Sequence, residues 1–221
     1  MGTDGDYATD TIYSWSNLTS CPKNTTAYEG NGSLIKLANK DIIAAPSLYG
    51  CNIWRHSKLN TINLNTNYLN KIGLIWGNII EDTTWKIGGY SGWNFTAKEV
   101  LSEEITNVTE TYGPSEGISK IGLMYVSDYG FAASQSAWTT IVRDYGSSSI
   151  TSVNWLYLGT DEWTITLYAG SSNDAFYLTS DGNPSYYSVC NAYDIRPSFY
   201  LKNSVTYSSG DGPISNPFRI N

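Results

Sequence analysis

The second half of the chain constrains the fold most, because from Lys120 onward short apolar segments alternate with clusters of turn residues. Six segments have the length and apolar content of β-strands: residues 121–127, 154–158, 163–168, 175–179, 195–201 and 205–207. Asp181-Gly182-Asn183 and Gly210-Asp211-Gly212 lie between such segments and are typical of hairpin turns. This pattern predicts a mostly antiparallel, twisted sheet connected by long loops.

Two helices are expected before this region. Apolar residues recur at spacings of three and four over residues 68–80, which favours an amphipathic helix. We expect its inward face to carry Tyr68, Leu69, Ile72, Ile75, Trp76, Ile79 and Ile80, with Asn70, Lys71 and Asn78 in solvent. A second helix is predicted over residues 97–105, where Thr96 and Glu99 have the spacing of a capping box. Helices followed by a strand-rich half indicate an α+β fold.

The composition favours contact through neutral polar and aromatic side chains. Charged residues make up 15% of the chain and aromatic residues 14%, against about 25% charged residues in an average domain. The net charge of -7 argues against nucleic-acid binding, since the lysines and arginines do not cluster to neutralise phosphates. There is no apolar run of the roughly 18 residues that would suggest a membrane helix.

The chain is expected to form one domain. Residues 1–12 are polar and small and predict a flexible lead-in. A single domain over residues 13–221 is expected to follow, with a separate N-terminal subdomain at 13–53 as an alternative. Cys21 and Cys51 could form a disulfide, which would leave Cys190 unpaired; equally, all three could be small buried residues. Both alternatives stay open.

Several motifs, in a fixed order, resemble a domain of bacterial surface proteins. They are Trp54-Arg55-His56-Ser57-Lys58-Leu59-Asn60 with Leu64-Asn65 and Tyr68-Leu69-Asn70, then residues 121–130, Glu162-Trp163-Thr164-Ile165, Asp181-Gly182, residues 195–201, and Gly210-Asp211-Gly212 with Asn216-Pro217-Phe218. Together they extend from about Trp54 to the C-terminus.

The domain that these motifs resemble occurs behind prepilin-type leaders and on other surface proteins, mainly in Firmicutes. It is similar to the C-type-lectin-like fold, in the branch shared with formylglycine-generating enzyme and retroelement-diversified variable proteins. The resemblance implies an extracellular adhesin or minor pilin whose anchor lies outside this sequence. The Glu-Pro-Asn and Trp-Asn-Asp motifs of sugar-binding C-type lectins are absent from the sequence, as is the redox cysteine pair of the enzyme branch.

The predicted ligand face lies between Trp163 and Arg196, the segment that the resemblance places on the binding surface. It is rich in Tyr, Asn and Ser, residues that anchor ligands at low entropic cost and form adaptable hydrogen bonds. The predicted ligand-binding residues are Tyr168, Asn173, Asp174, Tyr177, Asn183, Tyr186, Tyr187, Asn191 and Tyr193. Because strand side chains alternate, we expect one of Tyr186 and Tyr187 to point inward and the other outward. Trp163 is expected in the core, and Arg196 is expected to hold a loop.

A second aromatic segment, residues 85–93, carries Trp85, Tyr90 and Trp93 among glycines. It is expected to be a packed loop, with a second contact surface as the alternative.

Catalysis and metal binding have weaker signals. His56 is the only histidine, and we expect it to be structural or exposed. Asp161 and Glu162 beside Trp163 could serve a carbohydrate-active enzyme, with Asp174 or Asp194 as the second carboxylate, but adjacent strand residues face opposite ways. We interpret both as a solvated strand entrance. Asp174, Asp181 and Asp211 lack the spacing of a calcium loop and are interpreted as turn residues, so no cofactor is expected, with calcium as an alternative that no motif indicates.

The favoured function is therefore a non-catalytic recognition or adhesion domain that binds a protein or glycan on a host or another cell. The alternatives are a structural pilin-like or coat subunit and a carbohydrate-active enzyme.

Overall fold

The computed structural model describes residues 52, 54, 57, 59–106, 116–171, 174–189, 191–213 and 215–221. Several predictions fall outside these residues: the lead-in at 1–12, almost all of the optional subdomain at 13–53, the Cys21–Cys51 pair, Cys190, His56 and Asn173.

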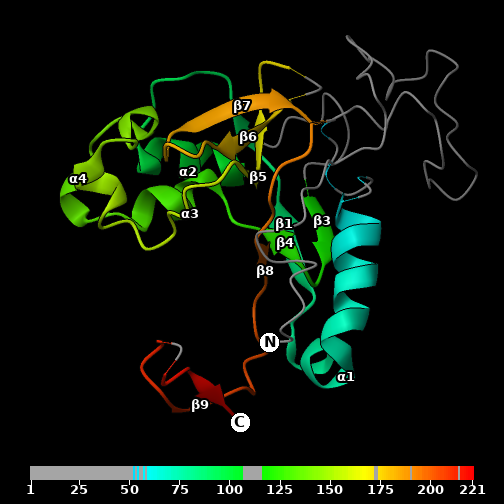
Figure 1. Cartoon of the computed structure of the whole chain (residues 1–221). Helices are drawn as coiled ribbons and strands as arrows, with labels where there is room; N and C mark the ends of the chain where they lie inside the picture. Colours follow the sequence, from blue (N-terminus) through cyan, green and yellow to red (C-terminus); the bar gives the residue numbers. More distant parts are fainter. Residues whose placement is uncertain are drawn as a thin grey trace, which may run out of the picture.

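The described chain has a mixed α+β fold, which confirms the predicted class at that level (Figure 1). Its helical segments are η4 (Leu59–Tyr68, π-type), α1 (Leu69–Ile79), α2 (Ala97–Thr106), α3 (Val126–Phe131) and α4 (Ser148–Thr151), with 3₁₀ turns at Gln135–Ala137 and Val142–Asp144. Its strands are β1 (Thr83–Lys86), β2 (Gly89–Tyr90), β3 (Glu116–Ser119), β4 (Gly122–Leu123), β5 (Glu162–Tyr168), β6 (Asp174–Leu178), β7 (Pro184–Ser188), β8 (Pro197–Ser198), β9 (Tyr207–Ser209) and β10 (Arg219–Ile220).

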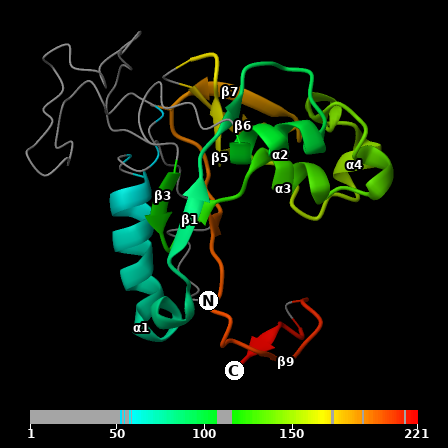
Figure 2. The same cartoon turned by 180° about the vertical axis from the view of Figure 1, so that it is seen from behind.

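The strands form one larger sheet and three small ones. The larger sheet has the order β2-β5-β6-β7, and the two-stranded sheets pair β1 with β3, β4 with β8 and β9 with β10. Among the pairings of these described strands, only β2 with β5 is parallel, so the sheets are mostly antiparallel as predicted. Figure 2 shows α2 and α3 beside the larger sheet and α1 beside β1 and β3.

Two apolar cores lie on opposite faces of the larger sheet. Along β5, Trp163 and Ile165 belong to a core with Trp54 and Trp85, whereas Phe176 of β6 belongs to a second core with residues of α2 and α3. The β5 strand is buried over five consecutive residues from Glu162 to Thr166, because both of its faces are covered. Trp163 is in the core, as predicted.

Helix α1 confirms the predicted helix, but its expected inward face is partly wrong. Ile75 is 82% exposed and Trp76 is half exposed, and the neighbouring Leu74 is 83% exposed. Gly73 has φ 82° and ψ 169° within the segment, a conformation that favours glycine. This break rotates the following turn out of register with the periodicity, so one continuous buried stripe does not form. No helix among the described residues is long and apolar enough to cross a bilayer.

Helix α2 confirms both the second predicted helix and its capping box. The backbone N–H of Thr96 donates to Glu99 Oε2 at 2.7 Å, and the N–H of Glu99 donates to Thr96 Oγ1 at 3.4 Å. These bonds satisfy donors that the first helical turn leaves without partners, and the backbone bond lowers the pKa of Glu99.

The predicted strands at 163–168 and 175–179 are confirmed as β5 and β6, with the predicted turn around Gly182 leading into β7. The strand at 154–158 is wrong. Asn154 donates its Nδ2 to the carbonyl of Tyr129 and accepts the N–H of Leu156, so its side chain fixes a turn. Residues 195–201 contribute only the two-residue strand β8.

The strand predicted at 121–127 is also cut short. It contributes only β4, and α3 begins at Val126. The carboxylate of Asp128 accepts the N–H of Tyr125 at 2.9 Å, and Thr166 Oγ1 accepts the N–H of Val126 at 3.0 Å. These two acceptors stabilise the first turn of a helix where apolar composition alone predicts a strand.

Candidate functional site

The predicted ligand-binding residues do not share one surface. We call the five tyrosines at 168, 177, 186, 187 and 193 the tyrosine hairpin. The register pairs Tyr177 with Ser185 and Ala175 with Tyr187, so these residues lie on one face of the sheet. Tyr186 pairs with Phe176 and lies on the other face, together with Tyr168. The segment therefore presents tyrosines on both faces, not one continuous patch.

On the face that carries Tyr168 and Tyr186, the rings pack against one another. Tyr168 and Tyr186 stack with centroids 3.6 Å apart and planes 9° apart, and Trp93 packs against Tyr186 at 4.4 Å. The Tyr168 pKa is raised to about 12, chiefly by its side-chain hydrogen bond with Tyr186 and then by burial. These half-buried rings contribute to the core beside Phe176, and stacking leaves no space for a ligand between them.

The opposite face, which carries Tyr177, shows a similar arrangement. Tyr177 and Tyr193 stack at 4.5 Å with planes 19° apart, and Trp163 lies 4.8 Å from Tyr193. Burial, followed by the neighbouring charge of Tyr177, raises the pKa of Tyr193. Both tyrosines are half-buried and pack against the first core.

Tyr187 is the tyrosine of this set that is open to solvent, at 53% exposed, while Tyr186 is packed. The predicted in-and-out pair is therefore confirmed. The expectation of a broad exposed tyrosine surface is corrected, because the other four rings have ring partners. Ligand binding by these residues stays a prediction.

The polar members of the predicted site take part in hydrogen bonds within the fold. Asn183 Oδ1 accepts the N–H of Gly146 at 2.6 Å, and Asn191 Nδ2 donates to the carbonyl of Ser188 at 2.9 Å. Asp174 begins β6, and its carbonyl accepts Asn52 Nδ2 at 2.7 Å. Asn191 thus stabilises a local turn, whereas the bonds of Asn183 and Asp174 join segments 37 and 122 residues apart in the sequence.

Glu162 and Arg196 form a buried ion pair, which corrects the solvated interpretation of Glu162. The Arg196 Nε and Nη2 atoms donate to the two carboxylate oxygens at 2.9 and 2.6 Å, and Nη2 also donates to the Leu156 carbonyl. Glu162 is only 2% exposed, and burial raises its pKa while Arg196 opposes that rise. Arg196 holds a loop, as predicted. Asp161 is exposed, and its Oδ1 accepts the N–H of Ser180.

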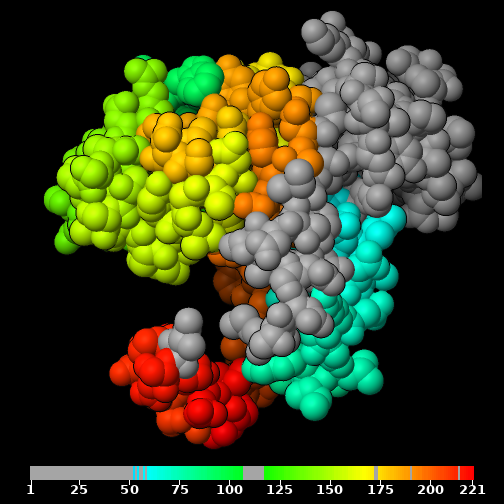
Figure 3. All heavy atoms as spheres, in the orientation of Figure 1, coloured from blue at the N-terminus to red at the C-terminus, as the bar shows by residue number. Residues whose placement is uncertain are grey.

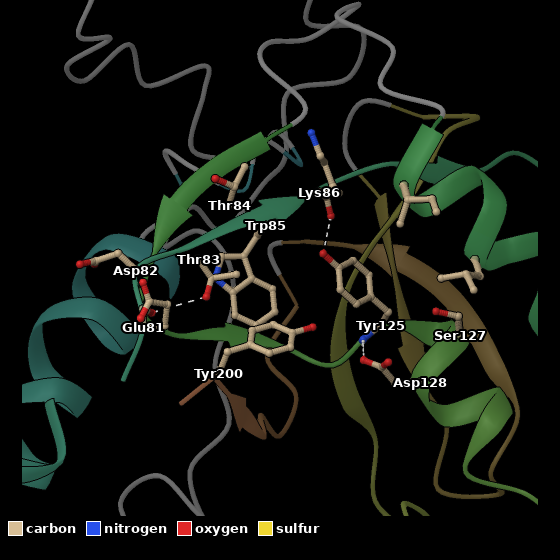
Figure 4. Close-up of a pocket in the computed structure, with 12 residues that line it drawn as sticks. Glu81, Asp82, Thr83, Thr84, Trp85, Lys86, Tyr125, Ser127, Asp128 and Tyr200 are labelled. Atoms are coloured by element: carbon tan, nitrogen blue, oxygen red, sulfur yellow. Dashed lines mark hydrogen bonds between the residues drawn. The ribbon is translucent and has the colours of Figure 1, made fainter. Parts of the chain in front are cut away.

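A different part of the molecule contains a cavity of about 560 Å³ (Figure 4). We call it the aromatic cavity. Its lining comes from the segment leading into β1, from β1 itself, from α2, from the start of α3, and from the chain after β8. The lining residues are Glu81, Asp82, Thr83, Thr84, Trp85, Lys86, Leu101, Ile105, Tyr125, Ser127, Asp128 and Tyr200.

The β1–β3 and β4–β8 pairs fix the floor of this cavity. Trp85 is 3% exposed, and its indole N–H donates to the Ser119 carbonyl at 3.0 Å. A Cβ at Gly122 would lie 2.7 Å from the Trp85 ring, so only glycine allows the indole to lie flat against β4. Tyr200 lies 5.6 Å from Trp85 with planes 44° apart and is 57% exposed. The sequence thus fixes one ring as floor and leaves another at the entrance.

Tyr125 forms a third aromatic wall. Its centroid lies 6.3 Å from that of Trp85, with planes 36° apart, and its hydroxyl donates to the Lys86 carbonyl at 2.7 Å. Burial, followed by the charge of Glu104, raises the pKa of the Tyr125 hydroxyl. It is therefore a neutral donor whose ring orientation is fixed.

Carboxylates lie around the three rings. Glu81 and Asp82 precede β1, and Asp128 lies in the first turn of α3, where burial raises its pKa. Lys120 donates to the Ile80 carbonyl and lies 3.7 Å from Asp82, an exposed pair that neutralises that carboxylate weakly. Among the residues that the structure describes, no group of three or more His, Cys, Asp and Glu side chains could hold a metal ion.

Glu104 of α2 lies behind this region and is fully buried. Its Oε1 accepts the Thr166 hydroxyl at 2.5 Å and the Ser127 N–H at 3.3 Å, whereas no hydrogen-bond partner reaches Oε2. Burial raises the Glu104 pKa to about 7, against the opposing effect of these hydrogen bonds. A buried carboxylate with one unpaired oxygen is unfavourable when ionised.

Sequence reasoning found Trp85 within an aromatic segment, but it predicted a packed loop where the structure has β1 and β2. It did not find Tyr125, Asp128 or Tyr200 as site residues. These residues come together in the cavity only because three segments that are distant in sequence meet in the fold, and no spacing in the sequence indicates that meeting.

Chemically, the aromatic cavity offers ring faces, one oriented hydroxyl and carboxylates, which suits binding through stacking and charge. Comparisons of the chain with protein-family models, curated proteins and solved structures gave no match.

Proposed function

We propose that the chain is a non-catalytic recognition domain of a bacterial surface protein or minor pilin, with a C-type-lectin-like fold, and that its ligand enters the aromatic cavity. The observation that carries this proposal is the cavity of about 560 Å³ with Trp85 as its floor, Tyr125 as a wall and Tyr200 at its entrance. Concave sites with aromatic walls and a few polar groups are typical of ligand binding.

The extracellular setting is supported by the composition. Few charges, many tyrosines and the ordered surface-domain motifs are consistent with a domain that contacts a protein or glycan outside the cell. The mixed α+β architecture is compatible with the C-type-lectin-like fold.

The geometry lends no support to the carbohydrate-active alternative built on Asp161 and Glu162. Glu162 uses both carboxylate oxygens to bind Arg196 and is buried, so a substrate would have to break that ion pair. A general acid must reach the group that it protonates, and this carboxyl does not reach the surface.

The proposal is tested by applying the purified protein to arrays of glycans and bacterial and host surface proteins. We expect binding that Tyr200→Ala removes and Tyr207→Ala preserves. Both residues are exposed tyrosines, but Tyr207 lies in the β9–β10 hairpin, which protrudes from the body in Figure 3. Absence of any bound partner, or equal binding by Tyr200→Ala, would refute the proposal. Release of soluble sugars from an arrayed glycan would refute its non-catalytic part.

The structural-subunit alternative draws on a different observation, the apolar surface of α1. Leu74, Ile75 and Trp76 are adjacent and exposed, and single-chain surfaces do not usually keep such a cluster in water. If this surface packs against a second copy, sedimentation at high concentration will show assemblies. The double variant Leu74→Ser and Ile75→Ser should dissociate them into monomers. A monomer over the whole concentration range would exclude this alternative.

A further inference from the structure

We propose that the aromatic cavity receives an alkylammonium group, either from a lysine side chain or from an amino sugar. This inference rests on the proposed function, because it names the chemistry of the ligand that enters the same cavity.

The rings of the cavity leave one aromatic side chain open. Trp85 contacts Tyr125 and Tyr200 at centroid separations of 6.3 and 5.6 Å with tilted planes, and Tyr200 is 57% exposed, so its ring remains accessible beside the cavity. A cation is attracted to an aromatic face within about 6 Å of the ring centroid. The tyrosine hairpin shows the contrasting geometry, since Tyr168 and Tyr186 lie 3.6 Å apart and occupy each other's faces.

The lining carries more negative than positive charge. Glu81, Asp82 and Asp128 contribute three carboxylates, of which Asp82 lies 3.7 Å from the ammonium group of Lys120, while Lys86 contributes one ammonium group to the lining. The Lys86 side chain leaves β1 on the opposite side from that of Trp85, and Figure 4 shows its amino end directed away from the rings. The cavity beside Tyr200 is therefore lined by negative charge, which favours a cation and disfavours a phosphate or carboxylate ligand.

Asp128 is held in place and can be reached by a ligand. Its Oδ2 accepts the Tyr125 N–H, and the residue is exposed to solvent, so its carboxylate is accessible to a cation. Asp128 thus fixes the start of α3 and also lines the cavity (Figure 4).

The test uses two probes and their neutral counterparts. The lysine source is represented by Nα-acetyl-lysine methylamide against the norleucine analogue, which has the same apolar stem without the ammonium group. The amino-sugar source is represented by glucosamine against N-acetylglucosamine. Binding to the full chain is followed by NMR titration of the Trp85 indole N–H, which lies at the cavity floor.

We expect at least one ammonium probe to shift the indole signal and its neutral counterpart to bind at least about fivefold more weakly. Raising the salt concentration should weaken binding of the ammonium probe, because salt screens the electrostatic part of its attraction to the cavity. Which of the two ammonium probes binds identifies the source.

Matched variants locate the effect. Tyr200→Ala and Asp128→Asn should each weaken binding of the ammonium probe about fivefold. In Asp128→Asn, the asparagine keeps an oxygen that can accept the Tyr125 N–H. Tyr207→Ala is the control for ring loss, and Asp144→Asn is the control for charge, since Asp144 is exposed and pairs with Arg143 at 3.6 Å. Both controls should bind as the unaltered chain does.

Three results would overturn this inference. If a neutral probe shifts the Trp85 signal as strongly as its ammonium partner, the cavity binds ligands but not through a cation, and the proposed function stands. If no probe binds while Tyr200→Ala still abolishes capture on the arrays, the ligand chemistry is wrong and the cavity is correct. If neither probes nor array partners bind, both proposals fall.

Discussion

The tyrosine hairpin and the aromatic cavity contain the same kinds of side chain but use them in opposite ways. In the hairpin, rings stack in pairs at 3.6 and 4.5 Å and fill each other's faces. In the cavity, Tyr200 contacts Trp85 at 5.6 Å but remains 57% exposed, so much of its ring faces solvent beside the cavity. Aromatic content alone therefore does not identify a binding surface. The exposure that a ring keeps after packing decides whether a tyrosine only stabilises the fold or is also accessible to a ligand.

The largest expected effect on stability comes from breaking the buried ion pair between Arg196 and Glu162. Arg196→Ala leaves Glu162 buried without its partner, which should lower the free energy of unfolding by about 3 kcal/mol. Urea denaturation at pH 7 measures it. Arg143→Ala, which removes an exposed pair with Asp144, is the control and should change stability by less than about 0.5 kcal/mol. Equal effects would show that the buried pair contributes no more than a surface pair.

A second expected effect concerns pH and the region behind the cavity. The Glu104 pKa is raised from 4.5 to about 7 in the folded chain, so the folded state holds this proton more tightly than the unfolded state does. The contribution of Glu104 to the free energy of unfolding should therefore be highest below pH 4.5. It should fall as the pH rises from about 4.5 to 7 and level off above pH 7. The full change corresponds to about 3 kcal/mol.

Glu104→Gln isolates this contribution, because glutamine keeps an oxygen for Thr166 and Ser127 but does not titrate. The difference between the two proteins in free energy of unfolding, measured by urea denaturation from pH 4.5 to 8, should grow as the pH rises. A constant difference across that range would show that Glu104 titrates normally.

A third effect separates the tyrosines within the hairpin. Tyr186→Ala removes a ring that packs against Tyr168, Trp93 and Phe176, and should lower the free energy of unfolding by about 2 kcal/mol. Tyr187→Ala removes an exposed ring from the adjacent position and should lower it by less than about 1 kcal/mol. Thermal denaturation of the two variants compares them directly. Similar losses would mean that the stacking contributes little.

The smallest expected effect on stability is at the cavity entrance. Tyr200→Ala should change the free energy of unfolding by less than about 1 kcal/mol, because the ring is largely in solvent. The same denaturation measurement checks it. A loss as large as that of Tyr186→Ala would make Tyr200 a structural residue and would weaken its assignment to the site.

Local signals predicted the parts of the fold whose interactions are local. The capping box of Thr96 and Glu99 and the turn at Gly182 depend on neighbours in sequence, and both are present. The strand predicted at 154–158 failed because Asn154 bonds to Tyr129, which is 25 residues away. Apolar composition does not reveal such a competing partner.

The candidate site was predictable only in part for the same reason. Alternation correctly separated Tyr186 from Tyr187, since it follows from strand geometry. That each remaining tyrosine would stack on another ring depends on the register of β5, β6 and β7, and the meeting of Trp85, Tyr125 and Tyr200 depends on three distant segments. Both follow from tertiary packing.

The most direct test of the comparison is ligand capture by three proteins under the same conditions: the unaltered chain, Tyr200→Ala and Tyr187→Ala. Our account predicts that Tyr200→Ala loses capture while Tyr187→Ala keeps it, because the open space lies at the cavity. Capture that survives Tyr200→Ala but is lost in Tyr187→Ala would contradict it and return the binding surface to the tyrosine hairpin.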